Sequence, residues 1–429
     1  MRVAFLSLAV PGHLNPMTAL ARTLQARGHE VVFLTVPDAA PFVHAAQLPF
    51  VPCSEDAYPH GSLGKLLQPL SLLSGTEALS YTLEIMKGYT ESLFRSLPKT
   101  LSKTGADAIV LDQYQPYVEL IPKSLGMPYV HVSNALHVDY TGRSPLCFYG
   151  RRPNGSDETA RNREEVERFR VLLEPTTAMA RQYARKAGLS VDWENPSSTV
   201  SPLLWVTQTP RDFDFDSAPH VPQFHYSGPW HDGYGRLPVE FPWERLTGKP
   251  IVYVSMGTLQ NGVTETFRAI AASAKRLKHL QFVLAIGNQI TPEQIGETAS
   301  NVLTVAYAPQ IELLKRSSLC ITHAGLNTVL ESLGVGVPFV AIPITNDQPG
   351  VAARIAHKKV GLAISQDNLF SSDLPALVTQ AVEDSTLRAN AGRLSESISK
   401  TDGLATAAGL IEKALGLRRA ADPQSNRAA

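Results

Sequence analysis

The strongest indication of the fold lies in the second half of the chain. Residues 307–348 have the sequence YAPQIELLKRSSLCITHAGLNTVLESLGVGVPFVAIPITNDQ. The apolar run Leu319–His323 has the length of a buried strand, and the small-residue turn Ala324–Gly325 separates it from a helix pattern that begins at Leu326. A second apolar run, Phe339–Ile342, completes a strand–helix–strand unit. Such units build parallel sheets that are covered by helices.

The same alternation extends through most of the chain. In the first 130 residues, the strand Arg2–Leu8 precedes a helix that we expect to start with Asn15 as its N-cap and Pro16 at its first position, and to stop at Gly28. Further strands are predicted at Glu30–Val36, Phe50–Pro52, Ala106–Asp112, Pro128–Val132, Ile251–Ser255, Gln281–Ile286 and Val302–Ala306. We therefore predict an α/β protein with two Rossmann-like, doubly wound parallel sheets that face each other across a cleft.

Prolines mark the boundary between the two domains. They recur seven times between residues 210 and 250, a density that prevents regular helix and indicates a linker. The expected parts are an N-terminal domain, a linker, a C-terminal domain whose last helix could pack back on the N-terminal lobe, and a flexible tail, at residues 1–222, 223–250, 251–417 and 418–429. The segments Ser62–Met86 and Asn134–Asp192 interrupt the alternation. We expect them to form a pocket wall, with capping of the sheet as the alternative.

Composition limits the classes of function. The chain has 429 residues, and its 39 Lys and Arg balance 39 Asp and Glu, which argues against nucleic acid as a partner. Its three cysteines lie far apart, so we expect reduced and mostly buried thiols. No apolar run approaches the roughly 18–20 residues of a transmembrane segment, and the N-terminus lacks a signal-peptide cleavage site. We therefore expect a cytoplasmic enzyme, whose oligomeric state is left open.

The turn after the first strand carries a candidate base. Its sequence, LAVPGHLNP at residues 8–16, lacks the GxGxxG spacing of a dinucleotide-binding turn, which disfavours a dehydrogenase. His13 in this turn could take a proton from a hydroxyl, and Asp112 at the end of a later strand could orient the imidazole. The alternative is that His13 only packs in its turn and Asp112 caps the next helix.

The second half offers a candidate phosphate site. Free backbone N–H groups at the start of the helix at Leu326 favour phosphate, and His323 adds a donor beside them. Asn327 and Thr328 lie on the first turn, and Glu331 follows one turn later, where a carboxylate could bind a ribose diol. The loop SMGT at residues 255–258 is a second turn suited to phosphate oxygens. Ordinary strand-to-helix turns remain the alternative for each piece taken alone.

Taken together, these motifs resemble the signature of UDP-dependent glycosyltransferases, which have the two-lobed GT-B fold. The N-terminal GHLNPMTALARTLQARGHEVVFLT, residues 12–35, is equally typical of that family. The string ITNDQPGVAAR, residues 344–354, is most similar to bacterial zeaxanthin glucosyltransferases, and the first lobe resembles macrolide glycosyltransferases. The resemblance extends over nearly the whole chain, and the chain also resembles the plant-type UDP-glycosyltransferases.

The resemblance implies inverting transfer of a sugar, with glucose favoured, from a UDP-sugar co-substrate. No HExxH motif and no Cys/His cluster occurs in the sequence, so we expect no metal and no other cofactor. His13 would be the general base and Asp112 its partner. Tyr307, where the family usually has Trp, would stack on the nucleobase, and the backbone of Ala308 would pair with its edge. The other implied donor-binding residues are Gln310 and Glu331 for the ribose, Ser255, Gly257, Thr258, His323, Gly325, Asn327 and Thr328 for the diphosphate, and Asp347 and Gln348 for the transferred sugar.

The acceptor is left as a class. Ser62–Met86 and Asn134–Tyr149 supply Leu, Tyr, Phe and Pro without a charge cluster, so we expect a hydrophobic hydroxylated small molecule such as a polyphenol, carotenoid, macrolide or terpenoid. Two alternatives stay open: a UDP-sugar 2-epimerase-like isomerase, and a non-catalytic GT-B helper protein. The apolar segments and the His13–Asp112 pair argue against the isomerase, and the intact Asp347–Gln348 pair argues against the helper. A dTDP-sugar donor is not excluded.

Overall fold

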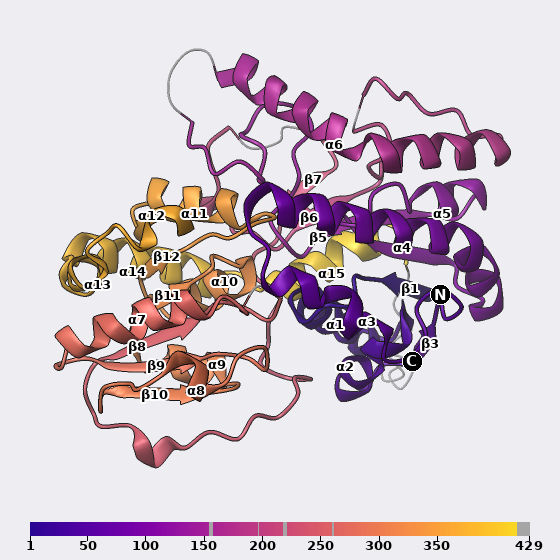
Figure 1. The fold of residues 1–429 in the computed structure, drawn as a ribbon. Helices are drawn as coiled ribbons and strands as arrows, with labels where there is room; N and C mark the ends of the chain where they lie inside the picture. Colours follow the sequence, from indigo (N-terminus) through magenta and orange to yellow (C-terminus); the bar gives the residue numbers. More distant parts are fainter. Residues whose placement is uncertain (154–157, 196, 218–220, 260, 418–429) are drawn as a thin grey trace, which may run out of the picture.

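The computed structural model describes residues 1–153, 158–195, 197–217, 221–259 and 261–417. The predicted tail at residues 418–429 lies outside the described residues. Figure 1 shows two lobes side by side, each built on a parallel sheet with helices on its faces. The prediction of two doubly wound α/β domains is confirmed.

The N-terminal lobe contains a seven-stranded sheet in the order β3-β2-β1-β4-β5-β6-β7, and every pairing is parallel. Its central strands are almost continuous apolar runs because both faces of the sheet are covered. The strands are β1 (Arg2–Leu6), β2 (Glu30–Thr35), β3 (Phe50–Pro52), β4 (Ala108–Asp112), β5 (Tyr129–Ser133), β6 (Trp205–Thr207) and β7 (Phe224–Tyr226). β7 lies inside the predicted linker, so the N-terminal sheet extends beyond the expected boundary at residue 222.

The first helix begins earlier than predicted. α1 spans Pro11–Ala26, its N-cap is Val10, and no side chain caps it, so the expected N-cap at Asn15 is wrong. Pro11 takes the first-turn position that proline favours. Pro16 consequently lies within the helix, and because proline has no N–H, the carbonyl of Gly12 receives no helical hydrogen bond from it.

The two inserted segments form long helices over the N-terminal sheet. α4 spans Gly75–Thr104, and α6 spans Glu158–Lys186 and continues through Pro175. The remaining helices of this lobe are η1 (Pro37–Ala39), α2 (Ala40–Ala45), α3 (Ser62–Leu67), η2 (Gln68–Ser71), α5 (Leu120–Ser124) and η3 (Arg211–Phe213).

The C-terminal lobe contains a six-stranded parallel sheet in the order β10-β9-β8-β11-β12-β13. Its strands are β8 (Ile251–Ser255), β9 (Gln281–Ala285), β10 (Val302–Val305), β11 (Ser317–Thr322), β12 (Phe339–Ala341) and β13 (Gly361–Ala363). Its helices, with η4 (Trp243–Arg245) in the linker, are α7 (Thr264–Arg276), α8 (Pro292–Ile295), α9 (Gln310–Leu314), α10 (Leu326–Gly334), α11 (Gln348–His357), α12 (Gln366–Leu369), α13 (Leu374–Glu383) and α14 (Ser385–Ser399). The predicted strands and the helix at Leu326 are therefore present.

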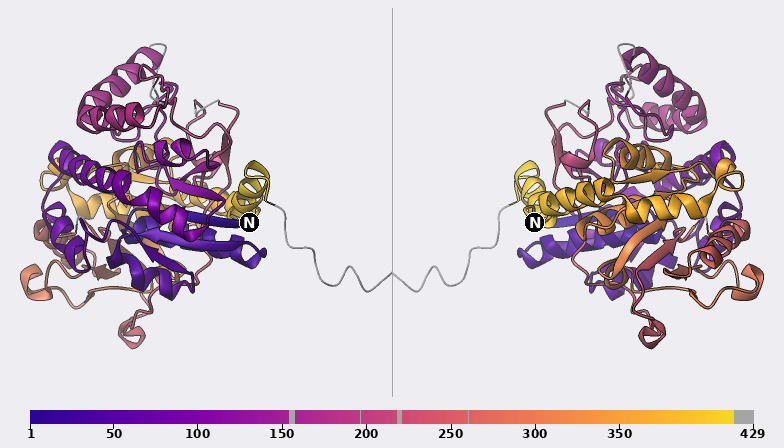
Figure 2. Two further views of the ribbon diagram at one scale, coloured as in Figure 1. Left: turned by 90° about the vertical axis from the view of Figure 1, so that its right-hand side faces the viewer. Right: turned by 90° about the vertical axis from the view of Figure 1, so that its left-hand side faces the viewer.

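The last helix, α15 (Gly403–Ala414), packs on α1 of the N-terminal lobe, which Figure 2 shows as yellow ribbon beside indigo. Glu412 of α15 accepts hydrogen bonds from Arg27 Nη1 (3.0 Å) and pairs with His29 Nε2 (3.1 Å). Apolar side chains of α15 such as Ile411 join the core cluster beneath α1. The chain thus crosses between the lobes twice.

The three cysteines, all among the described residues, are buried and form no disulfide. Within the described ranges, no helix has the length and apolar character needed to cross a membrane.

Candidate active site

The first group of predicted site residues lies at the carboxyl edge of the N-terminal sheet. His13 is in the first turn of α1, and Asp112 ends β4, the strand next to β1. His13 Nδ1 lies 2.6 Å from Asp112 Oδ2, and the Asp112 side chain has no exposed surface. The carboxylate also accepts hydrogen bonds from the backbone N–H of Tyr114 (3.0 Å) and from Asn134 Nδ2 (3.2 Å). A fixed carboxylate therefore orients the imidazole through Nδ1 and leaves Nε2 for another partner.

The electrostatics of this pair suit a proton acceptor. Burial by itself lowers the pKa of His13, but the charge and hydrogen bond of Asp112 outweigh burial, so the His13 pKa is raised above its ordinary value. Burial by itself raises the pKa of Asp112, and the interaction with His13 outweighs it, so the Asp112 pKa is lowered. Asp112 therefore stays charged and stabilises the protonated imidazole.

On the other side, the edge of the C-terminal sheet brings the predicted phosphate-binding residues together. His323 follows β11, and the loop Ser255–Thr258 follows the neighbouring strand β8. Two glycines make room for the imidazole, since a Cβ would lie 2.6 Å from His323 Nε2 on Gly257 and 2.5 Å from it on Gly325. Burial lowers the pKa of His323 to about 4, so this side chain is neutral at pH 7 and would act as an uncharged donor.

The residues predicted for the ribose form one hydrogen-bonded group. Gln310 Nε2 donates to Glu331 Oε2 (2.8 Å) and, more weakly, to Thr328 Oγ1 (3.3 Å), while Tyr253 Oη donates to Gln310 Oε1 (3.1 Å). Arg236, a linker residue that the sequence analysis missed, donates to the other oxygen of Glu331 at 2.5 Å. The linker thus reaches the predicted donor site.

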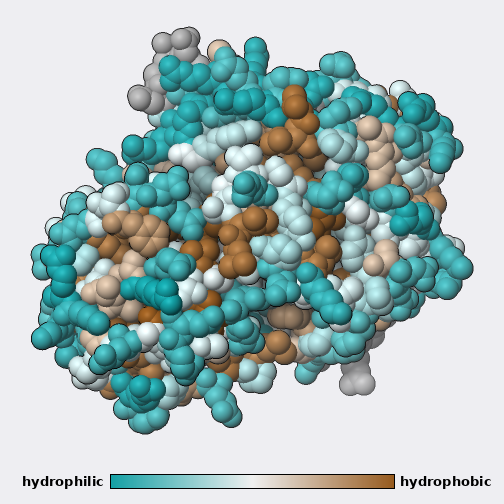
Figure 3. Space-filling model, viewed as in Figure 1, coloured by the Kyte–Doolittle hydropathy of each residue, from teal (hydrophilic) through white to brown (hydrophobic). Residues whose placement is uncertain are grey.

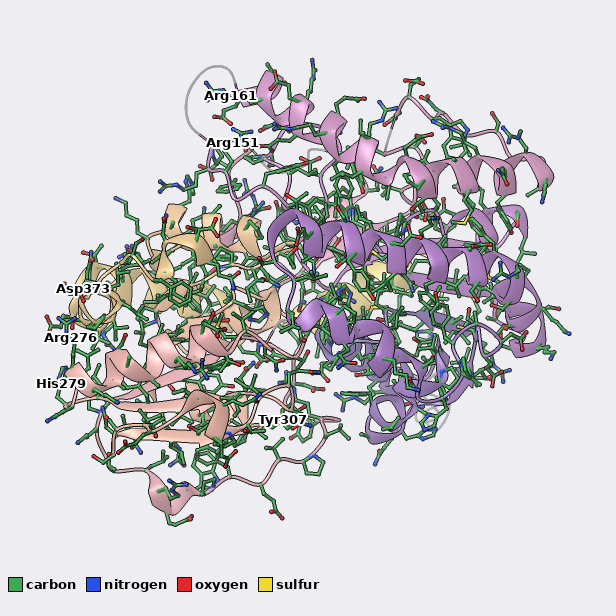
Figure 4. All side chains as sticks on the ribbon, viewed as in Figure 1. Arg151, Arg161, Arg276, His279, Tyr307 and Asp373 are labelled. Atoms are coloured by element: carbon green, nitrogen blue, oxygen red, sulfur yellow. The ribbon has the colours of Figure 1, made fainter. Side chains whose placement is uncertain are left out.

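Tyr307 and Ala308 follow β10 on the same lobe. The Tyr307 side chain, labelled in Figure 4, lies on the side of the C-terminal lobe that faces the N-terminal lobe. It is 46% exposed, so a planar group can reach the ring.

Asp347 and Gln348 lie between the two sheet edges, at the start of α11. Asp347 Oδ2 accepts a hydrogen bond from the backbone N–H of Leu136 in the N-terminal lobe (2.9 Å). Gln348 Oε1 accepts a hydrogen bond from the N–H of Ile344 (2.8 Å), which holds the loop before the helix. Burial raises the pKa of Asp347. This carboxylate therefore contacts both lobes.

Asn327, which was predicted to hold the diphosphate, bonds to the N-terminal lobe. Its Nδ2 donates to the carbonyl of Gly12, the carbonyl that Pro16 leaves without a helical donor. Its Oδ1 accepts a hydrogen bond from Gln208 Nε2 (2.7 Å), and Gln208 directly follows β6. Gln208 and Asn134 were not predicted from the sequence, although each is a polar residue directly after a strand at this edge.

A cavity of about 150 Å³ has the His13 imidazole in its lining. Apolar side chains from both inserted segments form its walls, as predicted; they include Leu63, Leu67, Leu70, Leu79, Leu83, Met86, Phe148, Phe169 and Leu173. Among the described residues that line it, Asp347 is the one carboxylate and no Lys or Arg is present. Figure 3, viewed as in Figure 1, shows hydrophobic side chains near the middle of the visible face of the molecule, where α3 and the start of α4 approach the C-terminal lobe. The cavity therefore suits an apolar molecule with a hydroxyl near His13.

In the parts of the chain that the structure describes, no three His, Cys, Asp or Glu side chains gather as a candidate metal site.

Comparison with known proteins identifies the relatives of this chain. Residues 189–402 match the family model described as UDP-glucoronosyl and UDP-glucosyl transferase. The chain is 26% identical over 420 residues to zeaxanthin glucosyltransferase of Pantoea ananas, with 96% of each chain covered. It is 26% identical to demethyllactenocin mycarosyltransferase of Streptomyces fradiae, with 96% of this chain and 86% of the relative covered. The solved structure of the glycosyltransferase of kitacinnamycin is similar to this chain with a TM-score of 0.73 at 21% sequence identity. The match covers 96% of this chain and 98% of that protein's chain.

The two facing Rossmann-like lobes have the GT-B fold, and the family match and the named relatives show that this chain is a glycosyltransferase. The chain belongs to the UDP-glucoronosyl and UDP-glucosyl transferase family.

Proposed function

We propose that this enzyme is an inverting glycosyltransferase that moves a sugar, with glucose favoured, from a UDP-sugar to a hydroxyl of a hydrophobic small molecule. The observation that carries the proposal is the position of His13, which lines an apolar cavity while Asp112 holds its Nδ1 at 2.6 Å. A base in that position can reach an acceptor hydroxyl, and the opposite sheet edge offers donors for a diphosphate.

The chemical step is a single displacement. The acceptor hydroxyl gives its proton to His13 Nε2 as its oxygen forms a bond to the anomeric carbon. The bond from that carbon to the diphosphate oxygen breaks, and its electron pair leaves with UDP. Attack from the face opposite the leaving group inverts the anomeric centre. The base supplies about 10²–10⁴-fold of the rate, and Asp112 stabilises the imidazolium that forms.

The charge that develops on the diphosphate meets donors of the C-terminal lobe. These are the free N–H groups of the first turn of α10, the neutral His323 and the loop Ser255–Thr258. Preorganised donors of this kind contribute about 3–4 kcal/mol each to the transition state. The proposal therefore includes no metal and no other cofactor.

The rest of the donor would lie along the residues already described. Tyr307 would stack on the base and Ala308 would pair with its edge, Gln310 and Glu331 would hold the ribose, and Asp347 with Gln348 would bind the sugar hydroxyls. The bond between Gln310 and Glu331 (2.8 Å) supports a joint role for these two side chains.

The acceptor proposal rests on the cavity and on the relatives. Its apolar lining favours a carotenoid, macrolide, polyphenol or terpenoid over a sugar or a peptide. Relatives named for zeaxanthin and for demethyllactenocin favour the first two classes.

Two substitutions test the assignment. His13→Ala is expected to lower turnover at least 100-fold and to leave UDP affinity by calorimetry unchanged. The exposed His44→Ala is the matched control and should keep wild-type turnover. Turnover of His13→Ala within twofold of wild type would contradict the base assignment.

A product assay tests the reaction class. Incubation with UDP-glucose and a panel of hydroxylated acceptors, followed by mass spectrometry, should give a glycoside. An isomerised nucleotide sugar formed without any acceptor would instead support the isomerase.

A further inference from the structure

A ring of amide groups joins the two lobes around the candidate base. Gln208 Nε2 donates one hydrogen bond to the carbonyl of Asn134 and one to Asn327 Oδ1 (2.7 Å). Asn327 Nδ2 donates to the carbonyl of Gly12, the residue before His13. Asn134 Nδ2 closes the ring by donating to Asp112 Oδ2 (3.2 Å). The bonds of this ring end on Asn134, on Asp112, on Gly12 beside His13, and on Asn327 in the first turn of α10.

The position of Gln208 makes it the centre of this ring. Its side chain is buried, with 1% exposed, and both N–H groups of its amide are used. Its Oε1 accepts a hydrogen bond from the backbone N–H of Trp230 (3.2 Å), so the amide cannot turn over without losing all three bonds. Gln208 does not line the acceptor cavity.

The Gly12 carbonyl is available for this ring because of Pro16. In a regular helix, the N–H of residue 16 would donate to the carbonyl of residue 12, and proline lacks that N–H. Asn327 supplies the missing donor from the other lobe. The orientation of α1, which carries His13, is therefore bonded directly to α10, where the diphosphate is expected.

We propose that Gln208 is a positioning residue that couples the donor site to the base. It holds Asn327 between the two lobes, and through Asn134 it also supports Asp112, so that the start of α10 and the His13 imidazole keep one fixed separation. This inference rests on the proposed function, since it assigns Gln208 a part in the same transfer reaction.

The proposal predicts a specific kinetic pattern. Gln208→Met removes both N–H donors at similar volume, and Gln208→Glu replaces them with an oxygen that faces two acceptor oxygens. Each variant should raise the KM for the nucleotide sugar about tenfold and lower kcat about tenfold, because a lost hydrogen bond near a charged site has an effect of that size. The KM for the acceptor should stay within twofold, because Gln208 lies outside the cavity lining.

A double-mutant cycle with Asn327→Ala tests the coupling. If Gln208 acts through Asn327, the double variant Gln208→Met/Asn327→Ala should have a donor KM close to that of the worse single variant, about tenfold above wild type, and not the product of the two effects. The matched control is Gln281→Met. Gln281 is also buried, accepts from Thr247 and donates to the carbonyl of Arg245, yet none of these residues belongs to the ring. Its effect should multiply with that of Asn327→Ala.

Three results would overturn the coupling. The first is a donor KM in the double variant that equals the product of the single effects. The second is a rise in acceptor KM as large as that in donor KM. The third is a lower thermal midpoint in both Gln208 variants with wild-type kinetics below that midpoint, which would leave Gln208 with a purely structural role.

The controls distinguish this failure from failure of the proposed function. If His13→Ala loses transfer while the Gln208 effects are multiplicative, the reaction assignment stands and only the coupling is wrong. If the wild-type protein binds neither UDP nor dTDP by calorimetry, both proposals are overturned.

Discussion

A buried ion pair between the lobes gives the sharpest prediction about stability. Arg354 on α11 donates through Nε to Asp214 Oδ1 at 2.7 Å, and the two side chains are 2% and 0% exposed. Arg354 also donates through Nη1 to the carbonyl of Gly350 (3.1 Å) and lies over the Phe215 ring at 4.2 Å. We predict that Asp214→Asn destabilises the protein strongly, because it leaves a buried guanidinium without its counter-ion.

The magnitude can be worked out from the pKa of Asp214. Burial would raise this pKa, but the charge of Arg354, the neighbouring His137 and the hydrogen bonds from Tyr226 and Arg354 together outweigh burial, and the pKa falls from 3.8 to about 2. A difference of that size corresponds to roughly 2.5 kcal/mol of stability. The stabilisation is complete above the unfolded-state pKa near 3.9 and is lost as the pH falls towards 2. Removing one partner adds the cost of an unpaired buried charge, and such losses reach about 3–5 kcal/mol.

The assay is urea unfolding at pH 7 of Asp214→Asn, Arg354→Met and the double variant. Each single variant should lose about 3–5 kcal/mol, and the double variant should lose far less than their sum because it has no unpaired charge. Donor KM should rise in both single variants, since α11 begins beside Asp347 and Gln348. The reasoning is refuted if the single losses add to the double loss within about 0.5 kcal/mol.

Three further predictions concern the site. Pro16→Ala supplies an N–H that competes with Asn327 for the Gly12 carbonyl, so donor KM should rise a few-fold at constant acceptor KM; an unchanged donor KM would show that this bond is not used. Gly325→Ala places a methyl 2.5 Å from His323 Nε2, and UDP affinity by calorimetry should fall at least about tenfold, whereas wild-type affinity would exclude the tight fit. His323 has a pKa of about 4 in the folded protein and near 6.5 in the unfolded chain. It therefore contributes about 3 kcal/mol of stability at neutral pH, which is lost as the pH falls from 6.5 to 4. The urea midpoint of His323→Gln should change less with pH over that range than the wild-type midpoint does.

The parts of the fold that could be predicted from the sequence are those with strong local patterns. Long buried strands such as β8 and the glycine-containing turn before α10 follow directly from apolar runs and small residues. β6 and β7 were missed because each has only three residues and lies among prolines at positions 202, 210, 222 and 229, without the helix pattern that separates the equally short β3 from β2. The start of α1 was misplaced because Pro11 and Pro16 are equally acceptable first residues by local rules, and packing decides between them.

The residues of the candidate site also fall into those that local sequence predicts and those that it does not. His13, Asp112 and the α10 turn could be predicted because each follows or ends a strand at a carboxyl edge. Gln208 was missed because β6, the strand that ends directly before it, has only three residues and was not predicted. Arg236 was missed because it lies in the linker, where no strand or motif marks it, and only the fold brings it to Glu331.

The return of α15 to the N-terminal lobe bears on how such enzymes can be recombined. Ala407, Ala408 and Ile411 belong to the same apolar core as Leu20 and Leu24 of α1. A chimera joined at a single point in the linker would therefore pair one parent's α1 with the other parent's α15. Lobe exchange needs a second junction, between α14 and α15 at residues 400–402, so that the N-terminal lobe travels with its own final helix. The unit that can be inherited or engineered as one piece is discontinuous in the sequence.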